Sequence, residues 1–129
     1  MTSHFSDMTH GWQTKTGTIP SKSNQYRIVT IGGHGSLAKT SGLKAYERSF
    51  YMQVGAYRSL NISGYFELRV RVYFPTMSHD LDNSLKCLLD CLQMTGTIKN
   101  DNKCVKITAE KFIDKANPRI EFEIEEVGI

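Results

Sequence analysis

Alternating apolar and polar residues mark three strands in the second half of the chain. In residues 65–74, phenylalanine, leucine and valine alternate with charged residues and tyrosine, and residues 104–113 and 119–127 repeat this period of two. Because side chains alternate between the two faces of a strand, each segment is expected to bury one face. The short link at residues 114–118 predicts that the last two strands pair as a hairpin.

Two other segments have the period of a helix. In residues 42–58 the apolar face is broad and interrupted only by Glu47, and Ser41 is a suitable N-cap. In residues 83–94 leucines lie at positions i, i+3, i+4 and i+7, and Gly96 is a stop signal. The second helix is so apolar that its one polar stripe is informative. That stripe consists of Asp82, Lys86, Asp90 and Gln93.

The first third of the chain is less regular. Residues 1–17 are polar and predict a flexible N-terminal arm, followed by a single domain at residues 18–129. Residues 26–31 predict a short strand that ends at the glycines of residues 32–35, which we interpret as a hairpin tip. Together the elements predict an α+β fold, a small mixed or antiparallel sheet with two helices packed on one face.

Composition excludes some classes of protein. The longest apolar run falls well short of the roughly 20 residues that cross a bilayer, and the first residues lack the apolar core of a secretory signal. We therefore expect a cytoplasmic protein that does not bind membranes. Cys87, Cys91 and Cys104 lack the close-set pairing of a structural zinc site, so we interpret them as small core residues, with zinc as the weaker alternative.

The net charge of +3 permits nucleic acid as a partner without favouring it. Lysines are concentrated between residues 99 and 115, and glutamates near the C-terminus. A lysine run more often forms a solvated surface than a track for phosphates. The basic residues considered for DNA contact are Arg69, Arg71, Lys99, Lys103 and Lys106.

Three aspartates are the candidate chemical groups. Asp80 and Asp82 precede and open the second helix, and in an extended segment residues i and i+2 face the same side. Converging carboxylates repel each other unless a divalent cation lies between them. Asp101 follows in a polar turn. The simpler alternatives are that Asp80 or Asp82 caps the helix and that Asp101 is a turn residue.

The segment from Asp80 to Leu92 resembles the central motif of RusA-type Holliday-junction resolvases. That motif has two aspartates separated by one residue, then asparagine, a lysine, and a helix containing an aspartate. The features here are Asp80, Asp82, Asn83, Lys86 and Asp90. The family's further acid after a glycine corresponds to Asp101 after Gly96. Weaker similarity extends over residues 18–127, including Pro20, Asn24 and Tyr26, and Thr40–Gly42.

The resemblance implies a homodimeric, magnesium-dependent endonuclease that resolves four-way DNA junctions in recombination and repair. It implies that Asp80, Asp82 and Asp101 hold Mg²⁺, with Mn²⁺ a possible substitute, and that Lys86 is an essential lysine. Asp90 is expected to orient Lys86. We expect a bacterial or phage origin, and the helix near Phe50 and Tyr51 is a candidate dimer interface.

The sequence departs from the family in one way that affects DNA contact. Where the family carries basic residues before its first aspartate, residues 76–79 hold no lysine or arginine. One alternative is a catalytically inactive dimer that binds branched DNA, but the missing basic run does not favour it, because a binder needs phosphate contacts even more than a nuclease does. That alternative is also disfavoured because unused carboxylates only weaken DNA binding. A second alternative is a structural protein in which Asp80 merely caps a helix.

Overall fold

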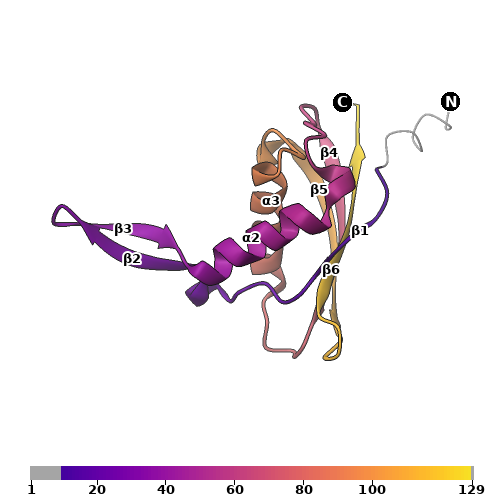
Figure 1. Cartoon of the computed structure of the whole chain (residues 1–129). Helices are drawn as coiled ribbons and strands as arrows, with labels where there is room; N and C mark the ends of the chain where they lie inside the picture. The colour runs from indigo at the N-terminus through magenta and orange to yellow at the C-terminus, as the bar shows by residue number, and fades with distance from the viewer. Residues whose placement is uncertain (1–9, 129) are drawn as a thin grey trace, which may run out of the picture.

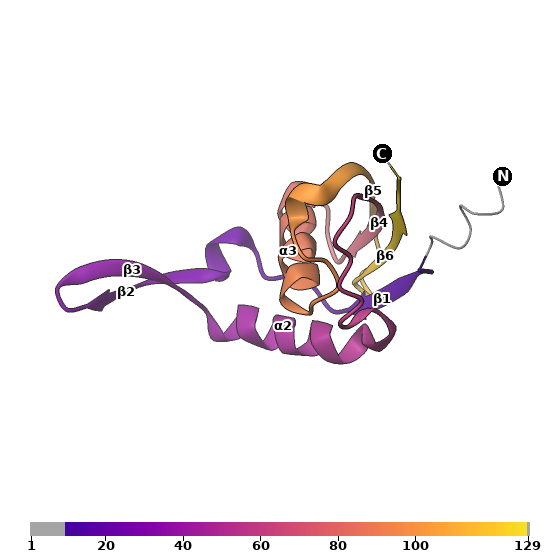
Figure 2. The same ribbon diagram turned by 90° about the horizontal axis from the view of Figure 1, so that it is seen from above.

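The computed structural model describes residues 10–128, which form a four-stranded mixed sheet, two α-helices and a separate β-hairpin (Figure 1). The predicted α+β class is confirmed, and both helices lie on one side of the sheet (Figure 2). In chain order the elements are β1 (Gln13–Thr16), η1 (Lys22–Asn24), β2 (Tyr26–Ile31), β3 (His34–Lys39), α2 (Ser41–Gln53), η2 (Gly55–Tyr57), β4 (Phe66–Phe74), α3 (Leu81–Met94), η3 (Asp101–Lys103), β5 (Cys104–Ile113) and β6 (Arg119–Glu126).

Strand β4 is the centre of the sheet and of the core. Its predicted alternation is confirmed, since every second residue from Phe66 to Phe74 is buried. The buried side chains of α2 and α3 cover this face. Phe50 of α2 stacks on Phe122 of β6 with ring centroids 5.8 Å apart. Cys87 and Cys91 of α3 also lie in this core, as predicted.

The predicted hairpin of the last two strands is wrong. The sheet order is β1-β6-β4-β5, so β4 lies between β5 and β6. Strand β5 runs parallel to β4 after the α3 crossover, and β6 runs antiparallel to β4. The link at residues 114–118 passes the end of β4, where the Asp114 amide donates to the Phe74 carbonyl at 2.8 Å. The length of the link does not distinguish these arrangements. Five residues can join two neighbouring strands, and they can also cross the end of one strand that lies between them.

Part of the predicted N-terminal arm belongs to the sheet. Residues 13–16 form β1, which pairs antiparallel with β6, and residues 1–9 of the predicted arm lie outside the described residues. Lys15 is 2% exposed, with its Nζ 4.1 Å from the centre of the Tyr46 ring. Burial lowers the pKa of Lys15. A lysine on the buried side of β1 conceals the apolar alternation that would have revealed this strand.

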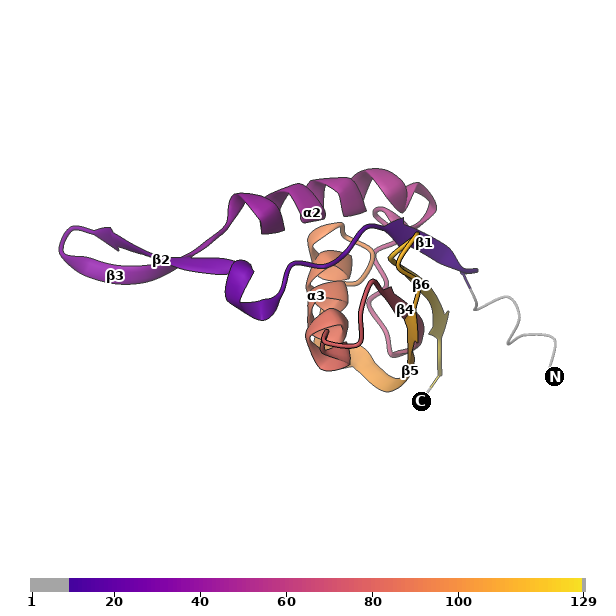
Figure 3. The same ribbon diagram turned by 90° about the horizontal axis from the view of Figure 1, so that it is seen from below.

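Strands β2 and β3 form a hairpin that projects away from the sheet and helices (Figures 1 and 3). The predicted tip is confirmed, because Gly32 and Gly33 have φ of 60° and 84°, which favour glycine. At the base of the hairpin, the Thr40 amide donates to the Gln25 carbonyl at 2.9 Å. This bond helps place Tyr26, the first residue of β2, beside α3.

Helix α2 begins and ends earlier than predicted. Its N-cap is Thr40, whose Oγ1 accepts the Leu43 amide at 3.2 Å, whereas Ser41 is the first helical residue. The helix ends at Gln53 because Val54 leaves the helical region, with φ −101° and ψ 41°, and the short η2 follows. The apolar period continues through η2, which is why the sequence predicts one longer helix.

We expect Thr40→Ala to lower the free energy of unfolding by about 1–2 kcal/mol, as for other lost N-caps. Thr40 Oγ1 also donates to the Asn24 carbonyl at 2.6 Å, so the substitution loosens the base of the hairpin too. Ser41→Ala is the matched control and should change stability by less than about 0.5 kcal/mol. Urea unfolding measures both, and equal losses would show that Thr40 is not the cap that matters.

Candidate active site

The polar stripe of α3 lines one side of a pocket. Asp82, Lys86 and Asp90 are all exposed, at successive i, i+4 positions, and Asp80 directly precedes the helix. The base of the β2–β3 hairpin forms the opposite wall. The pocket has a volume of about 430 Å³ and is lined by Gln25, Tyr26, Asp80, Asp82, Asn83, Lys86 and Asp90.

Asp80 occupies the N-cap position without acting as a side-chain cap. Its backbone is extended, with φ −92° and ψ 127°, and its carboxylate makes no capping hydrogen bond. The Asp82 carboxylate accepts the Asn83 amide at 2.9 Å through Oδ1. Both carboxylates remain on an exposed surface at the helix N-terminus, where the helix dipole favours negative charge. Helix capping therefore does not explain Asp80.

A buried amide supports this end of α3. Gln25 is only 8% exposed, and its Nε2 donates to Asn83 Oδ1 at 3.0 Å and to the Pro20 carbonyl at 2.9 Å. These bonds connect the base of the hairpin to the residue after Asp82. No motif or spacing in the sequence marks Gln25 as functional. Its burial is what singles it out, and no periodic pattern in residues 18–25 reveals that burial.

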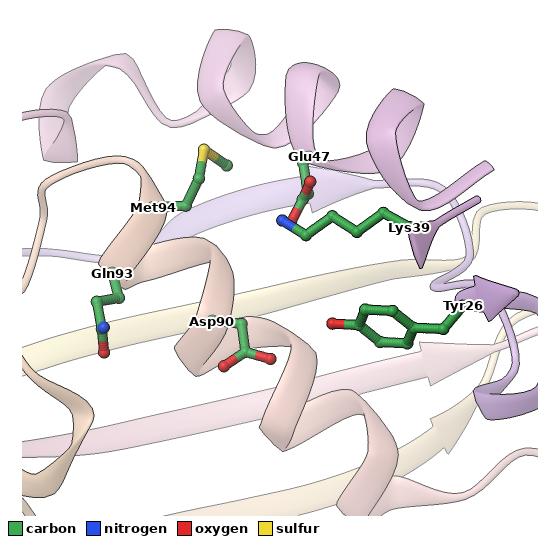
Figure 4. Close-up of a pocket in the computed structure, with 6 residues that line it drawn as sticks. All are labelled: Tyr26, Lys39, Glu47, Asp90, Gln93 and Met94. Carbon is green, nitrogen blue, oxygen red and sulfur yellow. The ribbon is translucent and has the colours of Figure 1, made fainter. Parts of the chain in front are cut away.

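Lys86 and Asp90 form an i, i+4 pair along the pocket, with Nζ and Oδ1 3.6 Å apart. Asp90 also borders a second pocket, where the Tyr26 hydroxyl points toward it from β2 (Figure 4). In that second pocket Lys39 and Glu47 form an ion pair at 2.8 Å. The charge of Glu47 is thereby compensated locally, whereas the pocket that Asp80, Asp82 and Asp90 line together has Lys86 as its cationic lining residue.

Asp101 does not join the other two aspartates within one chain. It lies in η3, after the C-terminus of α3, and its amide donates to Gln93 Oε1 at 3.1 Å. Gln93 is eleven positions after Asp82, which is about 16 Å along a helix axis. Among residues 10–128 no cluster of three or more histidine, cysteine or acidic side chains is placed to hold a metal.

The pocket is suited to a divalent cation bound with water and substrate. Its wall carries three carboxylates and one ammonium group, so a cation is electrostatically favoured there. Magnesium is commonly held by one or two carboxylates together with waters and substrate phosphates. Asp80 and Asp82 are carboxylates of this kind on the pocket wall.

Comparison with known proteins bears directly on this pocket. The model of the protein family described as endodeoxyribonuclease RusA matches residues 15–125. This range covers most of the chain and includes every residue that lines the pocket. The chain belongs to the RusA family. A search of curated proteins found no match. RusA-family enzymes are divalent-metal-dependent nucleases that bind and resolve branched DNA junctions.

The structure places the predicted basic residues of this RusA-family chain in two regions. Arg69 and Arg71 lie on the face of the sheet that points away from the helices. Arg69 bonds Glu123 and Glu125 at 2.7 and 2.8 Å, and Arg71 lies 3.6 Å from Glu121. The other three of these basic residues are lysines that lie close to Asp101 in the sequence. They are Lys99 and Lys103, which flank it, and Lys106 in β5.

The candidate dimer face also changes. Phe50 is fully buried in the core of its own chain, so it cannot contact a partner. Tyr51 is 43% exposed and lines a mostly apolar groove of about 480 Å³ with Met52 and Met94.

Within residues 10–128, no helix is both long and apolar enough to cross a membrane.

Proposed function

We propose that this RusA-family protein resolves four-way DNA junctions by paired, metal-dependent phosphodiester hydrolysis, acting as a homodimer. The observation that carries the proposal is the exposed Asp80–Asp82 pair, which shares a pocket with Lys86 and in which Asp80 makes no capping hydrogen bond. We propose Mg²⁺ as the ion, with Mn²⁺ as a possible substitute, and action in the cytoplasm of a bacterium, whether the gene is bacterial or comes from a phage or prophage.

Asp80 and Asp82 would hold the ion, and Gln25 would keep the start of α3 in place through Asn83. When bound, a divalent ion neutralises phosphate charge and lowers the pKa of a bound water. The side chains of the pocket then have two tasks. They must attract a cation into a surface that phosphate would otherwise avoid, and they must keep the scissile phosphate beside Lys86.

Lys86 is the cationic side chain that lines the pocket, and it can interact directly with phosphate. Its side chain is 75% exposed, so the ammonium group can reach a phosphate oxygen without being buried first. There it would stabilise negative charge that develops during hydrolysis. Asp90 restrains Lys86 through their i, i+4 pair, which is consistent with an orienting role.

We further propose that a second copy of the chain supplies Asp101. Since α3 separates Asp101 from Asp80 and Asp82 within one chain, the three aspartates can share an ion if two copies pack with η3 of one beside the start of α3 of the other. A two-fold dimer creates two such sites, one for each of the paired cuts.

DNA contact is proposed to depend more on Lys99, Lys103 and Lys106 than on Arg69 and Arg71. The two arginines face glutamates of β6, which compensate their charge. Lys103 lies 4.7 Å from the Tyr65 ring, and Lys106 is 4.0 Å from Glu67, at the limit of an ion pair. In the proposed dimer these lysines accompany Asp101 to the site and would contact the phosphates beside it.

Cleavage of a synthetic four-way junction with and without Mg²⁺ tests the proposal. Symmetric nicks that require the metal are the expected result. Tight junction binding without nicks in either Mg²⁺ or Mn²⁺ would instead indicate an inactive branched-DNA-binding protein. If neither binding nor nicking occurred, the proposed function would be rejected for this chain.

Lys86→Met should reduce the rate of junction cleavage by about 100-fold or more, as expected for loss of a group that stabilises transition-state charge. The free energy of unfolding should change by less than about 0.5 kcal/mol, because exposed i, i+4 pairs contribute that little. Single-turnover cleavage and thermal unfolding measure the two effects. Lys115→Met, which removes one exposed lysine elsewhere, is the control. Equal cleavage by both variants would exclude a catalytic role for Lys86.

A further inference from the structure

The loop between β4 and α3 determines where Asp80 lies. Residues 75–79 connect the end of β4 to Asp80 outside any helix or strand, and Thr76, Met77 and Ser78 are exposed. A loop on the surface has many accessible conformations unless specific contacts restrict it. The position of the Asp80 carboxylate therefore depends on what holds this loop.

Lys111 of β5 is the strongest such contact. It pairs in register with the buried Val72 of β4, and its side chain continues past the end of β4 to the loop. Its Nζ donates to the Met77 carbonyl at 2.8 Å and to the His79 carbonyl at 2.6 Å. Both bonds are charge-assisted, which makes them stronger than hydrogen bonds between neutral groups.

Aromatic contacts strengthen the same attachment. The His79 ring stacks on Phe74, with centroids 5.1 Å apart and planes 8° from parallel. The Lys111 ammonium group lies 5.4 Å from the centre of the Phe74 ring. Phe74 is the last residue of β4, so His79, the residue before Asp80, is attached to the central strand β4 and to the edge strand β5.

We propose that Lys111 is a positioning residue for the active site, which fixes Asp80 by holding the carbonyls of Met77 and His79. The proposal rests on the metal-binding role assigned to Asp80 under the proposed function. Lys111 differs from the other lysines of residues 99–115 because its ammonium group donates two hydrogen bonds to backbone carbonyls of the chain itself. DNA contact is not its role.

Lys111→Met tests this role, with Lys115→Met as a control that removes the same charge from an exposed position. In the protein without metal or DNA, amide hydrogen exchange in residues 76–80 should accelerate in Lys111→Met and stay unchanged in the control. The Mg²⁺ concentration for half-maximal junction cleavage should rise by about 10-fold or more, the cost typical of lost support around a metal ligand. Junction binding without metal should match that of the control.

Lys111→Arg is the rescue variant, since a guanidinium group can donate to both carbonyls. It should restore slow exchange and most of the Mg²⁺ response, and it provides the test if Lys111→Met does not fold. Unchanged exchange and Mg²⁺ response in Lys111→Met would overturn the proposal, as would a loss of junction binding equal to the loss of cleavage. If the wild type did not cleave, the proposed function would fail, while exchange would still report whether Lys111 holds the loop.

Discussion

Asp82→Asn is expected to abolish metal-dependent junction cleavage, by a factor on the order of 1,000 or more, while leaving the fold and junction binding intact. The substitution removes one of the two carboxylates that the chain places together at the start of α3. Its structural cost should be small. Asp82 is exposed, and an asparagine oxygen can still accept the Asn83 amide that Oδ1 accepts now. Loss of a charge in the first turn of a helix costs about 0.3–1 kcal/mol.

The loss should be specific to catalysis. Junction binding measured without metal should be equal to or tighter than that of the wild type, because the variant removes a negative charge from a surface that is proposed to face phosphate. Glu110→Gln removes the same charge from an exposed position on β5 and is the matched control. Cleavage by Asp82→Asn at the wild-type rate would exclude Asp82 as a metal ligand. A loss shared by Glu110→Gln would indicate that overall charge is responsible.

Local patterns were sufficient to predict most elements of the fold. The alternation in β4 and the leucine spacing in α3 both depend on residues that are close in sequence and buried on one face. Pairing between strands is different. Strand β6 could lie beside β5 or on the other side of β4, and every local pattern would be the same in both arrangements. The hairpin prediction for β5 and β6 failed for that reason, and the buried lysine in β1 concealed a strand that is part of the sheet.

The same distinction applies to the candidate site. Asp80, Asp82, Lys86 and Asp90 lie within one helical segment, so their spacing predicts their common face, and the structure places them around one pocket. Gln25 and Lys111 reach this segment from distant parts of the chain. Their importance comes from burial and from hydrogen bonds to backbone carbonyls, which a single sequence does not reveal.

Asp101 is the candidate residue whose observed position differs most from the position that the sequence predicts. Its position after a helix and a glycine permits a return toward Asp80, but α3 and the Gln93 contact hold it at the other end of the helix. A site shared between two copies, as proposed above, would bring Asp101 together with Asp80 and Asp82 despite this separation. That arrangement has a consequence that no single-chain site shares.

A mixture of Asp82→Asn and Asp101→Asn proteins is expected to nick junctions although each variant alone is inactive. If Asp101 acts on the Asp82 of the other copy, a mixed dimer contains one site with both substitutions and one site with none. Random pairing then leaves about a quarter of the wild-type sites intact. Because each active dimer has one working site, the products should be single nicks instead of symmetric pairs.

The experiment requires co-expression with two different affinity tags, so that the mixed dimers can be purified and shown to exist. If Asp101 served the Asp82 of its own chain, every site in the mixed dimer would carry one substitution, and no nicks would form. Nicking by the mixed dimer would therefore establish both the dimer and the exchange of Asp101 between subunits. Purified mixed dimers without activity would confine each site to one chain, and α3 would then have to move for Asp101 to reach it.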